Sequence, residues 1–126
     1  MRKIMLVMHR RVLAQSLVNL MRDDPEREFF AEYIYENAPM TAEIREADEA
    51  VIEMIEGDDE QIGECIDICR AIKAAAPECR LLLMCPENSF DGRHAAEEAR
   101  RSGLIDDYVF YDASLDYLIS KLDSMS

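Results

Sequence analysis

The sequence predicts an α/β protein with a doubly wound, five-stranded parallel sheet and helices on both faces. Short apolar stretches alternate with amphipathic helical stretches along the whole chain, which is typical of this class. Two of the apolar runs, Ile4–Met8 and Leu81–Cys85, are unbroken, as expected for parallel strands that are covered on both sides. No repeat or linker interrupts the alternation, so residues 1–126 are expected to form one domain, whose strand order the pattern leaves open.

Five strand–helix units are expected in chain order. The strands should lie at Ile4–Met8, Phe29–Tyr35, Ala50–Ile52 with a continuation towards Ile55, Leu81–Cys85 and Tyr108–Tyr111. The helices should lie at about Val12–Met21, Thr41–Ala47, Ile62–Ile72, Ser89–Arg101 and Leu115–Leu122.

Several helix ends are marked by individual residues. Asp58 with Gln61 three positions later resembles a capping box, and Ser114 is expected to cap the last helix. Gly103 follows Arg101 as a helix-terminating glycine. Pro39 is expected to break the chain after the second strand, so that Thr41 caps a short helix.

The charge balance excludes several classes of partner. The chain has 14 basic and 27 acidic residues and a formal charge of −13, which repels phosphate backbones and argues against nucleic-acid binding. The basic pairs Arg10-Arg11 and Arg100-Arg101 are too small to reverse this. No apolar run approaches the roughly 20 residues that span a bilayer, and the N-terminal run is too short for a signal peptide. We therefore expect a cytoplasmic protein without membrane contact.

The four cysteines are expected to act as small buried hydrophobes. Cys65 and Cys69 share the apolar face of a predicted helix, and their spacing matches neither a redox motif nor a zinc motif. A zinc site would need Cys65, Cys69 and Cys85 to converge from separate elements. A redox role for Cys85 lacks a neighbouring cation in the sequence.

The order and length of the elements resemble those of the response-regulator receiver family, the flavodoxin-like signalling domains. Lys3–Met8 resembles the first strand of that family, and Asp48–Glu53 resembles the strand that carries the phosphoacceptor. Asp107–Val109 followed by Ser114–Leu118 resembles its last strand and helix. The resemblance covers the whole chain and implies the receiver fold and a role in signal transduction.

The residues at the carboxyl ends of the strands, where such folds carry their sites, depart from the pattern of that family. The metal-binding acidic pair falls on Met8 and His9, the phosphoacceptor on Glu53, the hydroxyl residue on Cys85, and the lysine–proline pair on Tyr111 and Asp112. A thioether and an imidazole are poor Mg²⁺ ligands, and phosphoryl transfer depends on charge neutralisation. We therefore expect a pseudo-receiver that is not an enzyme, has no metal or cofactor, and binds a protein partner in bacterial signalling.

Two alternatives use the same residues. Glu53 could still accept phosphate as in a working response regulator, or His9 could act as a phosphocarrier with Arg10 and Arg11 around the phosphate. Glu53 could also favour an active-like state without phosphate, against the simpler reading that it is partly solvated or pairs with His9. A His9–Glu53 pair would be sensitive to pH, whereas a histidine at a strand end often makes only a structural hydrogen bond.

A self-complementary dimer is a further expectation from the resemblance. Receiver-like domains commonly pair through the fourth helix, fifth strand and fifth helix. The charged residues there are Arg100, Arg101, Asp106, Asp107, Lys121 and Asp123. Opposite charges on one face suit a two-fold contact, and the alternative is that they are ordinary solvated charges.

Overall fold

The computed structural model describes residues 1–126 and contains one five-stranded parallel sheet in the order β2-β1-β3-β4-β5. The strands are β1 (Arg2–Val7), β2 (Arg27–Glu32), β3 (Glu49–Glu53), β4 (Arg80–Cys85) and β5 (Asp107–Phe110). The helices are α1 (Arg11–Leu20), α2 (Ala38–Ile44), α3 (Asp59–Ala75), α4 (Phe90–Arg101) and α5 (Leu115–Met125), with a short 3₁₀ turn η1 (Tyr35–Asn37) before α2.

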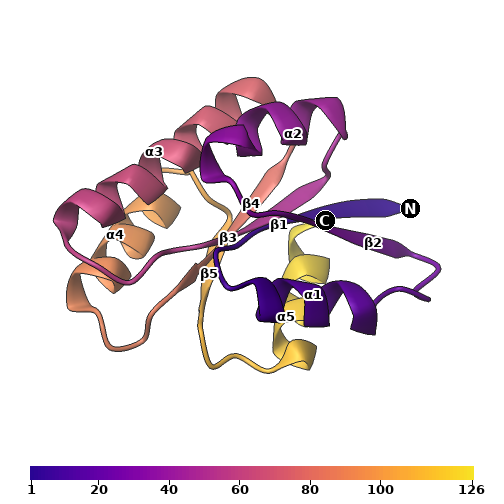
Figure 1. Ribbon diagram of the computed structural model, residues 1–126. Helices are drawn as coiled ribbons and strands as arrows, with labels where there is room; N and C mark the ends of the chain where they lie inside the picture. Colours follow the sequence, from indigo (N-terminus) through magenta and orange to yellow (C-terminus); the bar gives the residue numbers. More distant parts are fainter.

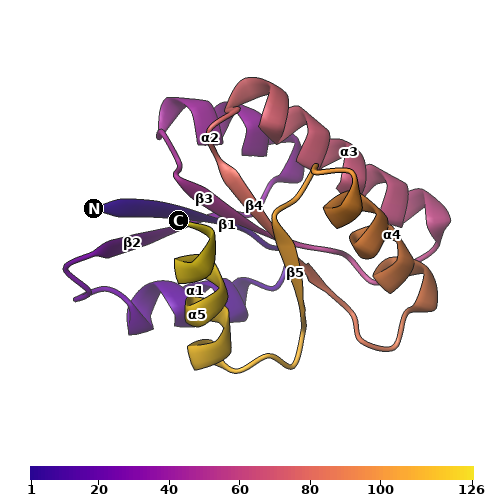
Figure 2. The same cartoon turned by 180° about the vertical axis from the view of Figure 1, so that it is seen from behind.

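The sheet is covered on both faces, which confirms the predicted fold class. Helices α2, α3 and α4 lie on one face and α1 and α5 on the other (Figures 1 and 2). Successive strand residues point to opposite faces, so Met5 joins the core beneath α2–α4 while Ile4 and Leu6 join the core beneath α1 and α5. Each face therefore has its own apolar core. None of the helices is long and apolar enough to cross a membrane.

The helix-end residues predicted at Asp58, Ser114 and Gly103 act as expected. Asp58 accepts a hydrogen bond from the backbone N–H of Gln61 at 3.1 Å, and the Gln61 side chain accepts one from the N–H of Asp58 at 3.0 Å. Ser114 accepts a hydrogen bond from the N–H of Tyr117 at 3.1 Å. Gly103, just after α4, has a φ of 81°, a conformation that glycine adopts without strain.

The prediction for the second strand and helix was partly wrong. Strand β2 ends at Glu32 and not at Tyr35, and Pro39 lies in the first turn of α2 and does not precede it. Proline fits there because the first-turn N–H groups have no partner within the helix. Thr41 is inside α2 and caps nothing; its hydroxyl donates to Glu32 at 2.6 Å.

The strand register places the carboxyl ends of β1, β3, β4 and β5 together. Val7 pairs with Ile52, Glu53 with Met84, and Cys85 with Phe110. The residues that follow these strands therefore meet at one edge of the sheet, as expected for this class.

Candidate functional site

The centre of this edge is the carboxylate of Glu53, which is completely buried at the end of β3. Its Oε1 accepts hydrogen bonds from the backbone N–H groups of His9 (3.1 Å) and Arg10 (3.2 Å) and lies 2.9 Å from His9 Nδ1. Its Oε2 pairs with Nε of Arg10. The expectation of a partly solvated Glu53 was wrong, whereas its pairing with His9 is present. Both carboxylate oxygens are occupied by groups of the chain itself.

Arg10 supplies the cation of this edge, whereas the sequence analysis considered it only as a phosphate-binding residue beside His9. Its guanidinium also lies over the ring of Tyr111, 4.5 Å from the ring centroid. An aromatic ring that follows β5 thus packs against a cation that follows β1, and such a cation–π contact is attractive. The signal in the sequence is a basic residue shortly after the first strand, close to the position where β3 delivers Glu53.

Two tyrosine hydroxyls hold the backbone that follows Glu53. Tyr35 donates to the carbonyl oxygen of Glu53, and Tyr111 donates to that of Met54. Burial, together with the negative charge of Glu53, raises the pKa of both tyrosines, so both stay protonated donors at neutral pH. The end of β3 is therefore tied to η1 on one side and to β5 on the other.

The other predicted site residues do not contact Glu53. Met8 is fully buried in the core beneath α1 and α5. Burial raises the pKa of the Cys85 thiol to about 11, so Cys85 is a neutral thiol at physiological pH. Asp112 is exposed in the β5–α5 loop near Glu87, and the hydrogen bond between the two carboxyl groups raises the pKa of Glu87.

The Mg²⁺ that a receiver pocket holds does not fit these residues. Met8 offers a buried thioether, and the Nδ1 of His9 is directed at Glu53. Glu53 is the one carboxylate at the centre of the edge, and Arg10 already neutralises it. Mg²⁺ needs several hard oxygen ligands in octahedral arrangement, which this set lacks.

The six charged residues predicted for a dimer face all have partners within the chain. Arg100 and Arg101 both pair with Glu97, and Lys121 pairs with Asp107 at 2.6 Å. Asp106 pairs with Arg80, and Asp123 is drawn to Arg2 and Arg27 at the starts of β1 and β2. The partners of Arg100, Arg101, Asp107 and Lys121 thus lie within α4, β5 and α5, whereas Asp123 is paired towards the starts of β1 and β2. The dimer face remains a prediction.

Neither a family model nor a curated protein matches the sequence significantly. Solved structures do match. A response regulator from Thermotoga maritima superposes with a TM-score of 0.77 at 17% identity, over 98% of this chain and 96% of the other. A two-component response regulator from Clostridium difficile gives 0.77 at 20% identity, over 99% and 95%.

The chain has the response-regulator receiver fold. A third structure that matches is described as one of a novel family of redox sensors in the streptococci, which evolved from two-component response regulators. It gives a TM-score of 0.76 at 13% identity, over 99% of this chain and 51% of that one.

Proposed function

We propose that this chain is a phosphorylation-independent pseudo-receiver that works in cytoplasmic signal transduction by binding another protein and catalyses no reaction. The observation that carries the proposal is the buried Glu53 carboxylate, whose two oxygens are already engaged by His9 and Arg10. A carboxylate held in this way is a poor nucleophile, because attack on phosphorus would require it to give up four donors.

In this proposal the ion pair holds the carboxyl edge of the sheet in one arrangement, which is the role that a phosphoryl group would have in a phosphorylated receiver. The N–H groups of His9 and Arg10 hold the β1–α1 loop against the end of β3, and Tyr111 joins β5 to the same point. These contacts form within the folded chain and need no added group. We infer that the surface around β5 is held permanently in one arrangement, so that recognition depends on the presence of the protein and not on its modification.

The face formed by α4, β5 and α5 is the surface that we propose for a protein partner, a second copy of the chain included. It carries aromatic side chains that lie outside the two apolar cores: Phe90 is 72% exposed, Tyr117 50% and Phe110 36%. Aromatic and arginine side chains are enriched in protein interfaces, and Arg101 lies on the same helix as Phe90.

The streptococcal neighbour supports the idea that the fold can be kept while its signalling chemistry changes. A redox role is less well supported for this chain. Burial raises the pKa of Cys79 to about 12 and that of Cys85 to about 11, and the pKa of Cys69 is also raised by its hydrogen bond with Cys65 and by burial. Buried neutral thiols react slowly with oxidants.

A His9 phosphocarrier is the second candidate. With Nδ1 directed at Glu53, Nε2 has no partner in the chain and the ring is 38% exposed. However, the Arg10 guanidinium is paired with Glu53, so a phosphate on His9 would have to compete with that carboxylate for Arg10.

The proposal is tested by capturing partners with the tagged chain in two parallel experiments, one with acetyl phosphate and Mg²⁺ and one without. The same partner should be recovered with the same affinity in both, and Phe110→Glu should abolish binding while Leu20→Glu, an exposed α1 position, should not. A partner that binds only after treatment with the phosphate donor would contradict the proposal.

A further inference from the structure

A cavity of about 640 Å³ opens beside His9, between the β2–α2 connection and the first half of α3. We propose that it binds an organic cation, an ammonium or guanidinium group on an apolar stem. Its volume lies within the range of small-ligand sites. The proposal concerns a different group of side chains from the Arg10–Glu53 pair, and it does not depend on whether the chain is phosphorylated.

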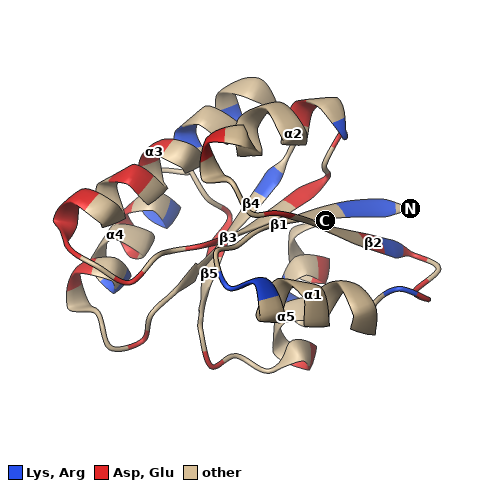
Figure 3. Cartoon of the chain, viewed as in Figure 1, with Lys and Arg blue, Asp and Glu red and all other residues tan.

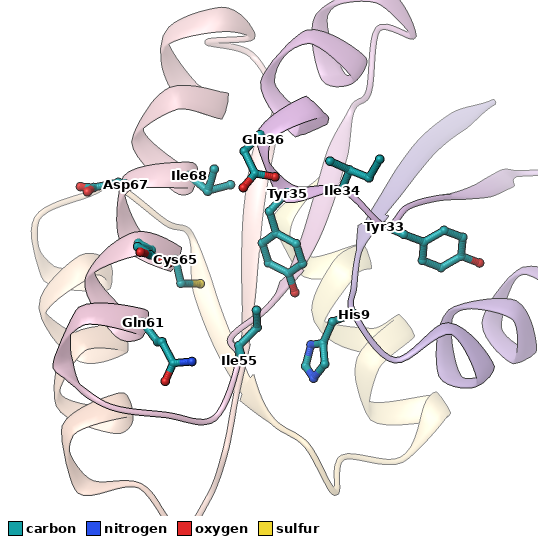
Figure 4. Close-up of a pocket in the computed structure, with 11 residues that line it drawn as sticks. His9, Tyr33, Ile34, Tyr35, Glu36, Ile55, Gln61, Cys65, Asp67 and Ile68 are labelled. Carbon is teal, nitrogen blue, oxygen red and sulfur yellow. The ribbon is translucent and has the colours of Figure 1, made fainter.

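The inner wall of the cavity is apolar. Ile34, Ile55 and Ile68 line it together with the ring of Tyr35, and the thiol of Cys65 points into it (Figure 4). Ile34 is 53% exposed, although a branched aliphatic side chain gains free energy when it is covered. An alkyl or aryl stem would cover these side chains, whereas a hydrated inorganic ion would not.

The rim of the cavity is acidic. Glu36 and Glu64 line it, both are exposed, and neither forms an ion pair with the chain. In Figure 4 the carboxylate of Glu36 lies between Ile68 and Tyr35. Asp67 points away and pairs with Arg70 at 3.0 Å, so it is already neutralised. No Lys or Arg lines the cavity.

The surrounding charge favours the same ligand. The segment 46–69, which includes the first half of α3, contains no Lys or Arg, and Figure 3 shows acidic residues gathered at the start of α3. An anion would meet this field unfavourably, whereas a cation would be attracted to it.

His9 also lines the cavity, and its neutral ring offers a hydrogen-bond acceptor. A carboxylate can only accept hydrogen bonds, so the 2.9 Å contact with Glu53 means that Nδ1 carries the proton. In the neutral ring Nε2 is then a hydrogen-bond acceptor, and His9 belongs to the lining of the cavity. A guanidinium or ammonium donor that enters the cavity can bond to Nε2 in this form.

The test uses butylguanidinium as the probe and butyrate, which has a similar apolar stem and the opposite charge, as its control. Titration is followed by NMR of the isoleucine methyl groups and of the His9 ring. Butylguanidinium should shift the signals of Ile34, Ile55, Ile68 and His9 with a Kd of about the millimolar range, as expected for so small a ligand. Butyrate should leave them unchanged.

The charge dependence is tested with matched double variants. Glu36→Gln/Glu64→Gln should weaken butylguanidinium binding about threefold or more, the effect of losing two exposed ion pairs. Glu43→Gln/Glu98→Gln removes the same charge at exposed positions outside the cavity and should change the Kd little. Equal shifts with butyrate, an equal loss in both double variants, or no shift at any probe concentration would overturn the proposal.

A second arm identifies the source of the cation. The peptide acetyl-Gly-Arg-Gly-amide presents the same guanidinium on a polypeptide. Binding of the peptide as tight as that of butylguanidinium assigns the cavity to an arginine side chain of a partner protein. Binding of butylguanidinium alone assigns it to a free small molecule.

Discussion

The guanidinium of Arg10 neutralises the buried carboxylate of Glu53, so that the cation and the anion of this edge both come from the chain itself. Arg10 follows β1 and Glu53 ends β3, so the pair joins two neighbouring strands. A carboxylate with no exposed surface would normally cost much free energy at a strand end. Pairing and hydrogen bonding offset that cost here.

Loss of Arg10 should therefore be costly. Arg10→Ala leaves Glu53 buried without its cation and should lower the free energy of unfolding by about 2–3 kcal/mol, less than for a fully buried pair because Arg10 is partly exposed. Arg11→Ala is the matched control and should cost only about 0.5–1 kcal/mol, the value of its contact with Tyr33. Urea denaturation measures both, and equal losses would show that the Arg10–Glu53 pair has no special role.

The hydroxyl of Tyr111 should matter separately from its ring. Tyr111→Phe keeps the ring beneath Arg10 and removes the donor to Met54 O, so the free energy of unfolding should fall by about 1 kcal/mol. Tyr117→Phe is the comparison: it removes a half-exposed hydroxyl whose one partner is the Lys121 side chain, and it should cost much less than Tyr111→Phe. Thermal and urea unfolding of the two variants provide the comparison. If Tyr111→Phe left the free energy of unfolding unchanged, the hydrogen bond between Tyr111 and Met54 would not stabilise the fold.

Glu97 predicts a specific loss of stability in acid. Its hydrogen bonds with Arg100, Tyr108 and Arg101 lower its pKa from 4.5 to about 2 in the folded state. Between these values the unfolded chain binds more protons, so the stabilisation is complete above pH 4.5 and is lost as the pH falls towards 2. Glu97→Gln should therefore melt below the wild type at neutral pH, with the difference shrinking over this interval. Glu98→Gln should show no such convergence.

Self-association through the α4–β5–α5 face can be measured by sedimentation. If Arg101 forms part of a two-fold contact, a dimer should weaken as salt rises, because exposed charges are screened beyond about 8–10 Å at ordinary ionic strength. Arg101→Glu should dissociate it, and Arg70→Glu, which reverses an equally exposed charge on α3, should not. A monomer at every concentration would leave this face to a different protein.

The sequence predicted the layers of the fold well, because runs such as Leu81–Cys85 report burial on both sides of a sheet. It did not predict the strand order, since burial does not say which strands are neighbours. The start of α2 was misplaced because Pro39 was read as a break, although proline is also favourable in a first helical turn.

The site was predicted in part. The position of Glu53 and its pairing with His9 followed from the ends of two strands, but the role of Arg10 depends on the register that sets Val7 beside Ile52. The pairing of residues between β1 and β3 cannot be read from any short stretch of the sequence. The cavity beside His9 was not predicted either, because its lining comes from the β1–α1 loop, the β2–α2 connection, the β3–α3 loop and α3 together.

Incubation with acetyl phosphate and Mg²⁺, followed by intact-mass measurement, tests the central claim most directly. Phosphoryl transfer to Glu53 would need a metal site, a free carboxylate and a free cation, and losing even one preorganised group typically costs about 10²–10³ in rate. We therefore predict no added mass for the wild type and none for Glu53→Gln. An acid-labile phosphoryl adduct would assign the chemistry to His9. An adduct that hydroxylamine removes, and that Glu53→Gln lacks, would show that Glu53 still accepts phosphate and would contradict the pseudo-receiver assignment.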